Sequence, residues 1–179
     1  DFCLSRGLGD VYKRQLIPTT ILTGFLGAGK TTLLNRILQE PHGFKIAVIE
    51  NEFGQENIDN EILVQDGTEQ IVEMNNGCIC CTVRGDLIIA LTSLAQKRNA
   101  GELQFDHVVI ETTGLANPGP VAQTFFVDEE VASEYLVDAI ITVVDAKHAM
   151  HQLDSYEEAQ RQVGFADKLL FSKTCLLYT

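Results

Sequence analysis

A glycine-rich segment that ends in a lysine and a threonine offers the clearest chemistry in this sequence. Residues 24–31 read GFLGAGKT and fit the pattern G-x-x-x-x-G-K-[ST] without a mismatch. In that pattern the glycines let backbone N–H groups surround a phosphate, the lysine reaches the β- and γ-phosphates, and the hydroxyl can bind Mg²⁺. The residues that we expect to hold a nucleoside triphosphate are Gly24, Gly27, Ala28, Gly29, Lys30, Thr31 and Thr32. The alternative is a chance glycine turn, which the strand and helix expected on either side disfavour.

A carboxylate stands at the end of an apolar run further along the chain. The segment VVIETTG places Glu111 at the carboxyl end of an expected strand, three residues before Gly114. Enzymes with a phosphate loop need a carboxylate at this place to hold Mg²⁺, and the glycine can bring its N–H close to a γ-phosphate. We therefore expect Lys30, Thr31 and Glu111 to serve catalysis, with Thr31 and Glu111 on the Mg²⁺ side. A glutamate that caps a helix is the alternative.

Three cysteines lie within four residues in the segment GCICC, at positions 78, 80 and 81. Three thiolates that converge in a turning loop make a soft site suited to Zn²⁺ or Cu⁺, with a fourth place for Glu50, a histidine or water. The spacing is too short for a two-knuckle zinc finger. We expect Cys78, Cys80 and Cys81 to bind a metal, while a redox dithiol and buried structural cysteines are the alternatives.

Weaker signals come from single residues. His148 and His151 are three residues apart and could share a metal, although a solvated helix face is the more ordinary explanation. Asp145 follows the apolar run AIITVV, and the pattern leaves open whether it lies near a nucleotide or on the surface.

Composition limits the class of protein. The 179 residues are 45% hydrophobic and 21% charged, which is typical of a globular domain, and their formal net charge is −12. A field of that sign repels a phosphate backbone, so we expect no nucleic-acid partner. The chain has no apolar run of about 18 residues, so we expect no membrane span. It opens without a basic start and an apolar run, which together with the clustered cysteines favours a cytoplasmic protein.

Apolar strands alternate with helices along the chain, which predicts an α/β fold with a mostly parallel sheet covered by helices on both faces. We expect one domain over residues 16–174 and a long polar loop over residues 51–66, and we interpret residues 1–15 and 175–179 as non-native tails. The expected strands are residues 16–23, 45–49, 70–74, 105–110, 139–144 and 168–171, and the expected helices are residues 31–39, 87–94, a short one that ends at 126, and 156–163.

Five motifs occur in a fixed order, namely GFLGAGKTT, ENEFG, GCICC, ETTG and SKT. Together they resemble the CobW-type P-loop GTPases, metallochaperones related to the urease and hydrogenase maturation GTPases. The resemblance implies a P-loop domain of the SIMIBI class that binds GTP and Mg²⁺ and carries zinc or cobalt. It also implies that Glu50 and the three cysteines are metal ligands, and that Ser172 and Lys173 begin the guanine motif.

The sequence departs from this family at one position of the guanine motif. Cys175 stands where the family has an aspartate that accepts two hydrogen bonds from guanine. Either the native chain was cut at this point or base specificity is lost, and the C-terminal domain that the resemblance implies lies outside the sequence given. We expect a slow GTPase that delivers its metal to an unidentified client metalloprotein, with homo-oligomers as an open question. A small-molecule kinase with a P-loop, and a zinc-binding or redox module with a vestigial nucleotide site, are the rival functions.

Overall fold

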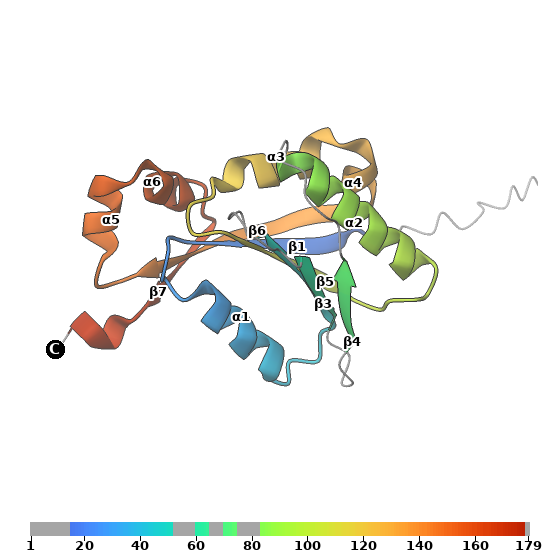
Figure 1. The fold of residues 1–179 in the computed structure, drawn as a ribbon, viewed down its shortest axis with the longest axis horizontal. Coiled ribbons are helices and arrows are strands. Elements are labelled where there is room, and N and C mark those ends of the chain that lie inside the picture. Colours follow the sequence, from blue (N-terminus) through green and yellow to red (C-terminus); the bar gives the residue numbers. More distant parts are fainter. Residues whose placement is uncertain (1–14, 52–59, 65–69, 75–82, 178–179) are drawn as a thin grey trace, which may run out of the picture.

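The fold is built on a seven-stranded sheet with the strand order β4-β3-β2-β5-β1-β6-β7. The computed structural model describes residues 15–51, 60–64, 70–74 and 83–177 (Figure 1). Strands β2, β5, β1, β6 and β7 pair in parallel, whereas β3 pairs antiparallel with β2 and β4 pairs antiparallel with β3. The strands are β1 Ile17–Thr23, β2 Ile46–Asn51, β3 Asn60–Val64, β4 Gln70–Met74, β5 His107–Thr112, β6 Tyr135–Asp145 and β7 Lys168–Ser172. The prediction of a mostly parallel α/β sheet is confirmed.

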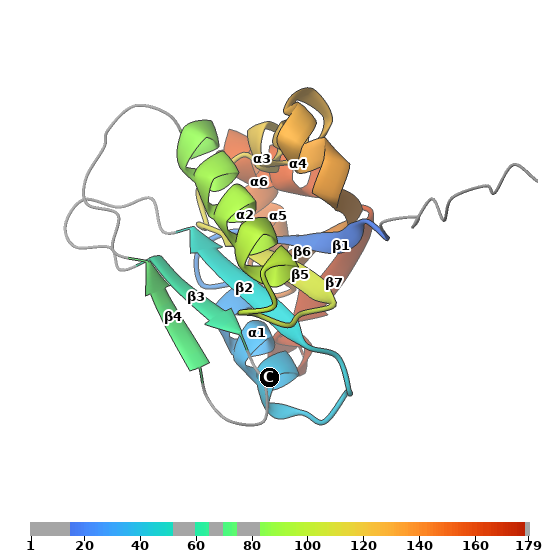
Figure 2. The ribbon, with the colours of Figure 1, turned by 90° about the vertical axis from the view of Figure 1, so that its right-hand side faces the viewer.

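Helices cover both faces of this sheet, as Figures 1 and 2 show. Helix α1 packs on one face, and α2, α3 and α4 pack on the other. The helices are α1 Lys30–Gln39, α2 Val83–Asn99, α3 Pro118–Val127, α4 Glu129–Glu134, α5 Ala149–Ser155 and α6 Glu157–Gly164, and a 3₁₀ helix η1 spans Thr174–Leu177. Within the described residues, no helix is long and apolar enough to cross a bilayer.

Strand β5 shows why both faces need a cover. Val109 packs with the core under α1, and Ile110 packs with the core under α2, α3 and α4. Successive side chains of a strand point to opposite faces, so a continuous apolar run requires helices on each side.

The expected loop over residues 51–66 was wrong in one part, because Asn60–Val64 forms strand β3. Its apolar run is only three residues long, which is a weak signal in the sequence, and the strand pairs with both β2 and β4. Helices α4 and α5 were not expected either. Of the two tails interpreted as non-native, residues 1–14 and 178–179 lie outside the described residues, whereas residues 175–177 belong to the 3₁₀ helix η1.

The strand register gathers polar residues at one edge of the sheet. Glu50 at the end of β2 is the register partner of Glu111 on β5, and Asp145 at the end of β6 is the partner of Ser172 on β7. Parallel strands share one carboxyl edge, and ligands of open α/β sheets bind outside that edge. Strand β1 ends at the same edge, and the glycine-rich segment begins directly after it.

Candidate nucleotide-binding site

The glycine-rich segment connects β1 to α1 in a conformation that favours glycine. Gly24, Gly27 and Gly29 have φ angles of 144°, 72° and 98°. A Cβ on Gly24 would lie 2.3 Å from the Val143 carbonyl oxygen, so this position has no room for a side chain. Gly29 is the N-cap of α1 and makes no side-chain cap bond. The first N–H groups of α1 are therefore not capped by that residue, which is the arrangement that binds phosphate at a helix N-terminus.

Lys30 is held inside the loop and not in solvent. Its side chain is buried, and Nζ donates a hydrogen bond of 2.9 Å to the Gly24 carbonyl oxygen. Burial lowers the pKa of Lys30, and the nearby Glu111 carboxylate opposes that shift. An ammonium group that has already lost much of its water costs less to transfer to a phosphate.

Thr31 and Glu111 meet beside the loop, although 80 residues separate them in the sequence. The Thr31 hydroxyl donates to Oε1 of Glu111 at 2.8 Å. Glu111 is buried, and its Oε2 has no hydrogen-bond partner among the described residues. A buried carboxylate oxygen without a donor, next to a hydroxyl, suits a hard divalent cation such as Mg²⁺.

The turn after β5 lies against the phosphate loop. The Ala116 N–H donates to the Thr113 carbonyl oxygen at 3.0 Å, which closes the turn. A Cβ on Gly114 would lie 2.6 Å from the Leu26 nitrogen. The backbone of this turn is therefore in close contact with the backbone of the loop that should surround the phosphates.

The end of β7 makes a second contact with the phosphate loop. The Ser172 hydroxyl donates to the Ala28 carbonyl oxygen at 2.6 Å. Lys173, the next residue, has a φ angle of 54° and directs its Nζ to Oδ2 of Asp145 at 2.8 Å. The two residues of the expected base motif are thus joined to the phosphate loop and to the end of β6.

Asp145 is a site residue whose role the sequence left undecided. Burial would raise its pKa, but hydrogen bonds from Lys173 and His148 outweigh that effect and lower the pKa to about 2. The His148 Nδ1 lies 2.9 Å from Oδ2, and the Lys147 N–H donates to Oδ1 at 3.0 Å. A carboxylate directly after the apolar run of β6 was the one signal that pointed to it.

The two histidines do not come together as a metal site. His148 contacts Asp145, whereas Nδ1 of His151 lies 3.4 Å from the Ser155 hydroxyl. Within the described ranges, no group of three or more histidine, cysteine, aspartate or glutamate side chains could hold a metal ion.

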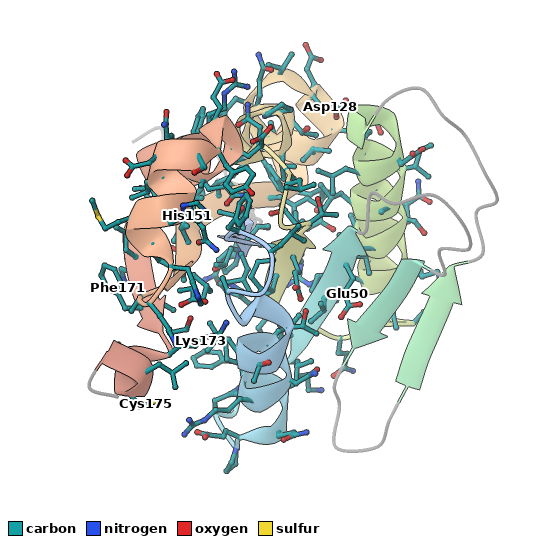
Figure 3. The ribbon with its side chains drawn as sticks, turned by 60° about the vertical axis from the view of Figure 1, so that its left-hand side comes forward. Glu50, Asp128, His151, Phe171, Lys173 and Cys175 are labelled. Atoms are coloured by element: carbon teal, nitrogen blue, oxygen red, sulfur yellow. The ribbon has the colours of Figure 1, made fainter. Side chains whose placement is uncertain are left out.

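The expected transition-metal site is described only at its edge. Cys78, Cys80 and Cys81 lie outside the described residues, and Glu50 is half-buried at the end of β2. Figure 3 shows Glu50 and Lys173 on opposite sides of the start of α1. Met74, the last residue of β4, pairs with Asn60, and Ile62 of β3 pairs with Ile49. Strand β4 therefore ends at the sheet edge where Glu50 lies.

Comparison with known proteins gives a consistent result. The profile of the family described as CobW/HypB/UreG, nucleotide-binding domain, matches residues 18–178. The zinc chaperone YjiA of Escherichia coli is 52% identical over 158 residues, which cover 88% of this chain and 49% of that protein. The zinc-regulated GTPase metalloprotein activator 1 of Schizosaccharomyces pombe is 43% identical over 167 residues, covering 90% of this chain and 40% of that protein.

A solved structure agrees with these relatives. The crystal structure of Zn(II)-bound YjiA GTPase from Escherichia coli matches with a TM-score of 0.70 and 47% identity, over 90% of this chain and 51% of that one. The chain spans about half the length of the curated relatives that it matches.

Proposed function

The chain belongs to the CobW/HypB/UreG nucleotide-binding domain family, and we propose that it is the GTPase domain of a zinc metallochaperone. In this proposal the domain binds GTP with Mg²⁺, hydrolyses it slowly, and delivers a transition metal to a client metalloprotein. Zinc is the proposed cargo, with cobalt as the alternative. The contact between Thr31 and Glu111 beside the buried Lys30 carries the nucleotide part of the proposal.

The phosphates would be bound by backbone N–H groups of the loop and by Lys30. The loop glycines and the uncapped start of α1 offer donors to the β-phosphate, Lys30 reaches the β- and γ-phosphates, and Thr32 lies by the α-phosphate. Thr31 and Glu111 would hold Mg²⁺, and the bound ion would supply positive charge to the phosphates during hydrolysis. Gly114 would present its N–H to the γ-phosphate.

Hydrolysis breaks the bond between the γ-phosphorus and the bridging oxygen, and water supplies the oxygen that replaces it. In the described part of the site, Lys30 is the cationic side chain that we expect to contact the phosphates. GTPases that hydrolyse quickly add an arginine finger, so we expect a slow intrinsic rate.

Base recognition would fall to Ser172 and Lys173 at the end of β7. The family's aspartate would accept two hydrogen bonds from guanine, and Cys175 stands at its position. We therefore propose that this chain distinguishes GTP from ATP poorly, because a buried guanine edge would lose its acceptor.

Metal binding would fall to Cys78, Cys80 and Cys81, with Glu50 as a further ligand. Glu50 and Glu111 are register partners on neighbouring strands, so the proposed zinc site and the proposed Mg²⁺ site share one edge of the sheet. Loops that a γ-phosphate orders could then change the affinity for zinc. The names of the relatives, a zinc chaperone and a metalloprotein activator, support zinc as cargo and a metalloprotein as client. We place this activity in the cytoplasm. The proposed function is compatible with a homo-oligomer.

Zinc titration tests the metal part of this proposal. We expect one high-affinity Zn²⁺ per chain by competition with a chromophoric chelator, and an affinity that falls with pH because thiolates must lose protons to bind. Replacing Cys78, Cys80 and Cys81 by serine should abolish the tight site. Cys175→Ser is the matched control, since Cys175 is an exposed free cysteine in η1, which follows the edge strand β7. Tight stoichiometric binding that survives the triple replacement would contradict the assignment.

A further inference from the structure

One buried amide of helix α6 is bonded to the turn that lies on the phosphate loop. Gln162 is 1% exposed, and its Nε2 donates to the carbonyl oxygens of Gly114 at 3.1 Å and of Ala116 at 3.0 Å. Both partners are acceptors, so the side-chain NH₂ and not Oε1 must face them. Oε1 has no partner among the described residues. Burying an amide oxygen without a donor costs free energy. Packing alone therefore does not explain why a glutamine stands at this position, and the two bonds to the turn suggest a functional reason.

The turn is held between Gln162 and the phosphate loop. On one side, Gly114 is so close to Leu26 that a Cβ would lie 2.6 Å from its nitrogen. On the other side, Gln162 bonds the carbonyl groups of the same turn. A trans peptide points its C=O and the following N–H in opposite directions. Bonding the carbonyls of Gly114 and Ala116 therefore fixes the two peptides that follow these residues. The bond from the Ala116 N–H to the Thr113 carbonyl oxygen fixes the peptide that carries the Gly114 N–H, so Gln162 holds that N–H in place through the turn.

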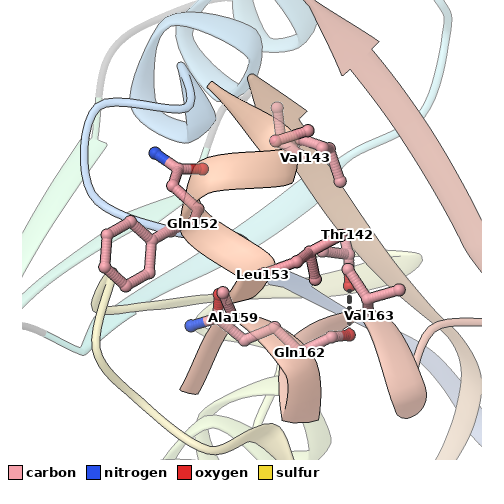
Figure 4. A pocket seen from close by; sticks show the side chains of 10 residues that line it. Thr142, Val143, Gln152, Leu153, Ala159, Gln162 and Val163 are labelled. Carbon is pink, nitrogen blue, oxygen red and sulfur yellow. Dashed lines mark hydrogen bonds between the residues drawn. The ribbon is translucent and has the colours of Figure 1, made fainter. Parts of the chain in front are cut away.

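The hairpin of α5 and α6 also contacts the phosphate loop directly. The rings of Phe25 and Tyr156 have centroids 4.7 Å apart and are tilted by 35°. Tyr156 lies between α5 and α6, and Phe25 lies within the phosphate loop. Phe25 also lines a small cavity together with residues of both helices, among them Leu153 and Gln162. Figure 4 shows the labelled side chains of α5 and α6 that line this cavity. Helix α6 is bonded to the sheet as well, because the Thr142 hydroxyl donates to the Gln162 carbonyl oxygen at 2.7 Å.

We infer that Gln162 is a positioning residue for GTP hydrolysis, which holds the turn of residues 113–116 against the phosphate loop and couples α6 to the γ-phosphate. This inference rests on the proposed function, because it takes the turn to contact that phosphate. Gln162 itself does not touch the nucleotide. Its action is on the backbone of Gly114, so its loss should affect GTP and the hydrolysis step more than GDP.

Methionine is the informative replacement, because Gln162→Met keeps the length of the side chain and removes the amide. Gln160→Met is the matched control on the same helix, since Gln160 is exposed and its amide bonds the Leu153 carbonyl oxygen in α5. We would measure kcat and KM for GTP, the affinities for GDP and a non-hydrolysable GTP analogue, and the Tm.

For Gln162→Met we expect kcat to fall at least tenfold and the ratio of analogue affinity to GDP affinity to fall about tenfold. The GDP affinity should stay within threefold of the parent, and Gln160→Met should match the parent throughout. A folded Gln162→Met protein with kcat and the affinity ratio within twofold of the parent would overturn the inference. Equal losses for GDP and the analogue would overturn it too, because they indicate a packing role.

Hydrogen exchange on the unaltered protein tests the same coupling if the variant does not fold. When the GTP analogue replaces GDP, amides of residues 113–117 and 157–164 should gain protection together. A change confined to residues 113–117 would overturn the coupling to α6. A parent protein that binds the analogue but does not hydrolyse GTP would contradict the proposed function, while the binding and exchange measurements would still decide the role of Gln162.

Discussion

A single methyl group at Gly114 should weaken GTP binding much more than GDP binding. In Gly114→Ala the new Cβ would lie 2.6 Å from the Leu26 nitrogen and 2.7 Å from its Cα. Carbon contacts are favourable at about 3.5–4.0 Å, so the two backbones must separate by roughly 1 Å. These are backbone atoms, and no side-chain rotation relieves the contact. Overpacking of this kind costs about 1–3 kcal/mol.

The turn should move before the phosphate loop does. The loop is held by the charged bond from Lys30 to Gly24 and by the short bond from Ser172 to Ala28. The turn is held by neutral bonds from Gln162, and charged hydrogen bonds are about twice as strong as neutral ones. A displaced turn loses its contact with the γ-phosphate, while the site of the β-phosphate is retained.

Calorimetric titration with a GTP analogue and with GDP measures this difference. A cost of about 1–3 kcal/mol corresponds to a loss of roughly 5–150-fold for the analogue, and we expect GDP to change by less than about threefold. Gly164→Ala is the control, because its Cβ meets no described atom within 4 Å and its site is the end of helix α6. Analogue affinity within twofold of the parent, or an equal loss of GDP affinity, would refute the reasoning.

Three further predictions concern other parts of the site. Lys30→Ala should abolish triphosphate binding but keep the fold, because it removes the charge at the phosphates together with the desolvation cost of a buried ammonium; isothermal titration and circular dichroism check both results. Cys175→Asp should raise the preference for GTP over ATP by about 5–150-fold in competition binding, since a buried unpaired donor edge costs about 1–3 kcal/mol, and an unchanged ratio would contradict this. The pKa of Asp145 lies at about 2, below the ordinary aspartate value of 3.8, so the ionised carboxylate stabilises the fold above pH 4 and that contribution is lost as the pH falls toward 2. The free energy of unfolding should therefore fall by about 1 kcal/mol more in the parent than in Asp145→Asn between pH 6 and pH 3.

Local patterns predicted the parts of the site that belong to one segment. The glycine-rich loop needs positive φ angles and an uncapped helix start. The glycines of residues 24–31 meet both requirements, so this local pattern was sufficient. Glu111 could be found because a protein with a phosphate loop needs a carboxylate at the end of an apolar strand to hold Mg²⁺. The parallel sheet followed from strands that are apolar on both faces.

The remaining features depend on contacts between distant segments, which one sequence does not reveal. Strand β3 exists because β2 and β4 flank it, although its own surroundings in the sequence are polar. Gln162 is one polar residue on a short amphipathic helix. Its proposed role depends on hydrogen bonds to carbonyl groups 46 and 48 residues away in the sequence. The partners of Asp145 likewise include Lys173, at a separation of 28 residues.

We propose that the nucleotide state changes the affinity of this domain for zinc, because Glu50 and Glu111 share one edge of the sheet. Zinc affinity should be measured by chelator competition with Mg²⁺ present, once with a GTP analogue bound and once with GDP bound. The proposed coupling predicts affinities that differ by about 5–150-fold, equivalent to ~1–3 kcal/mol. Equal zinc affinities in the two states would contradict it, and the domain would then be a GTPase that carries a metal without controlling it.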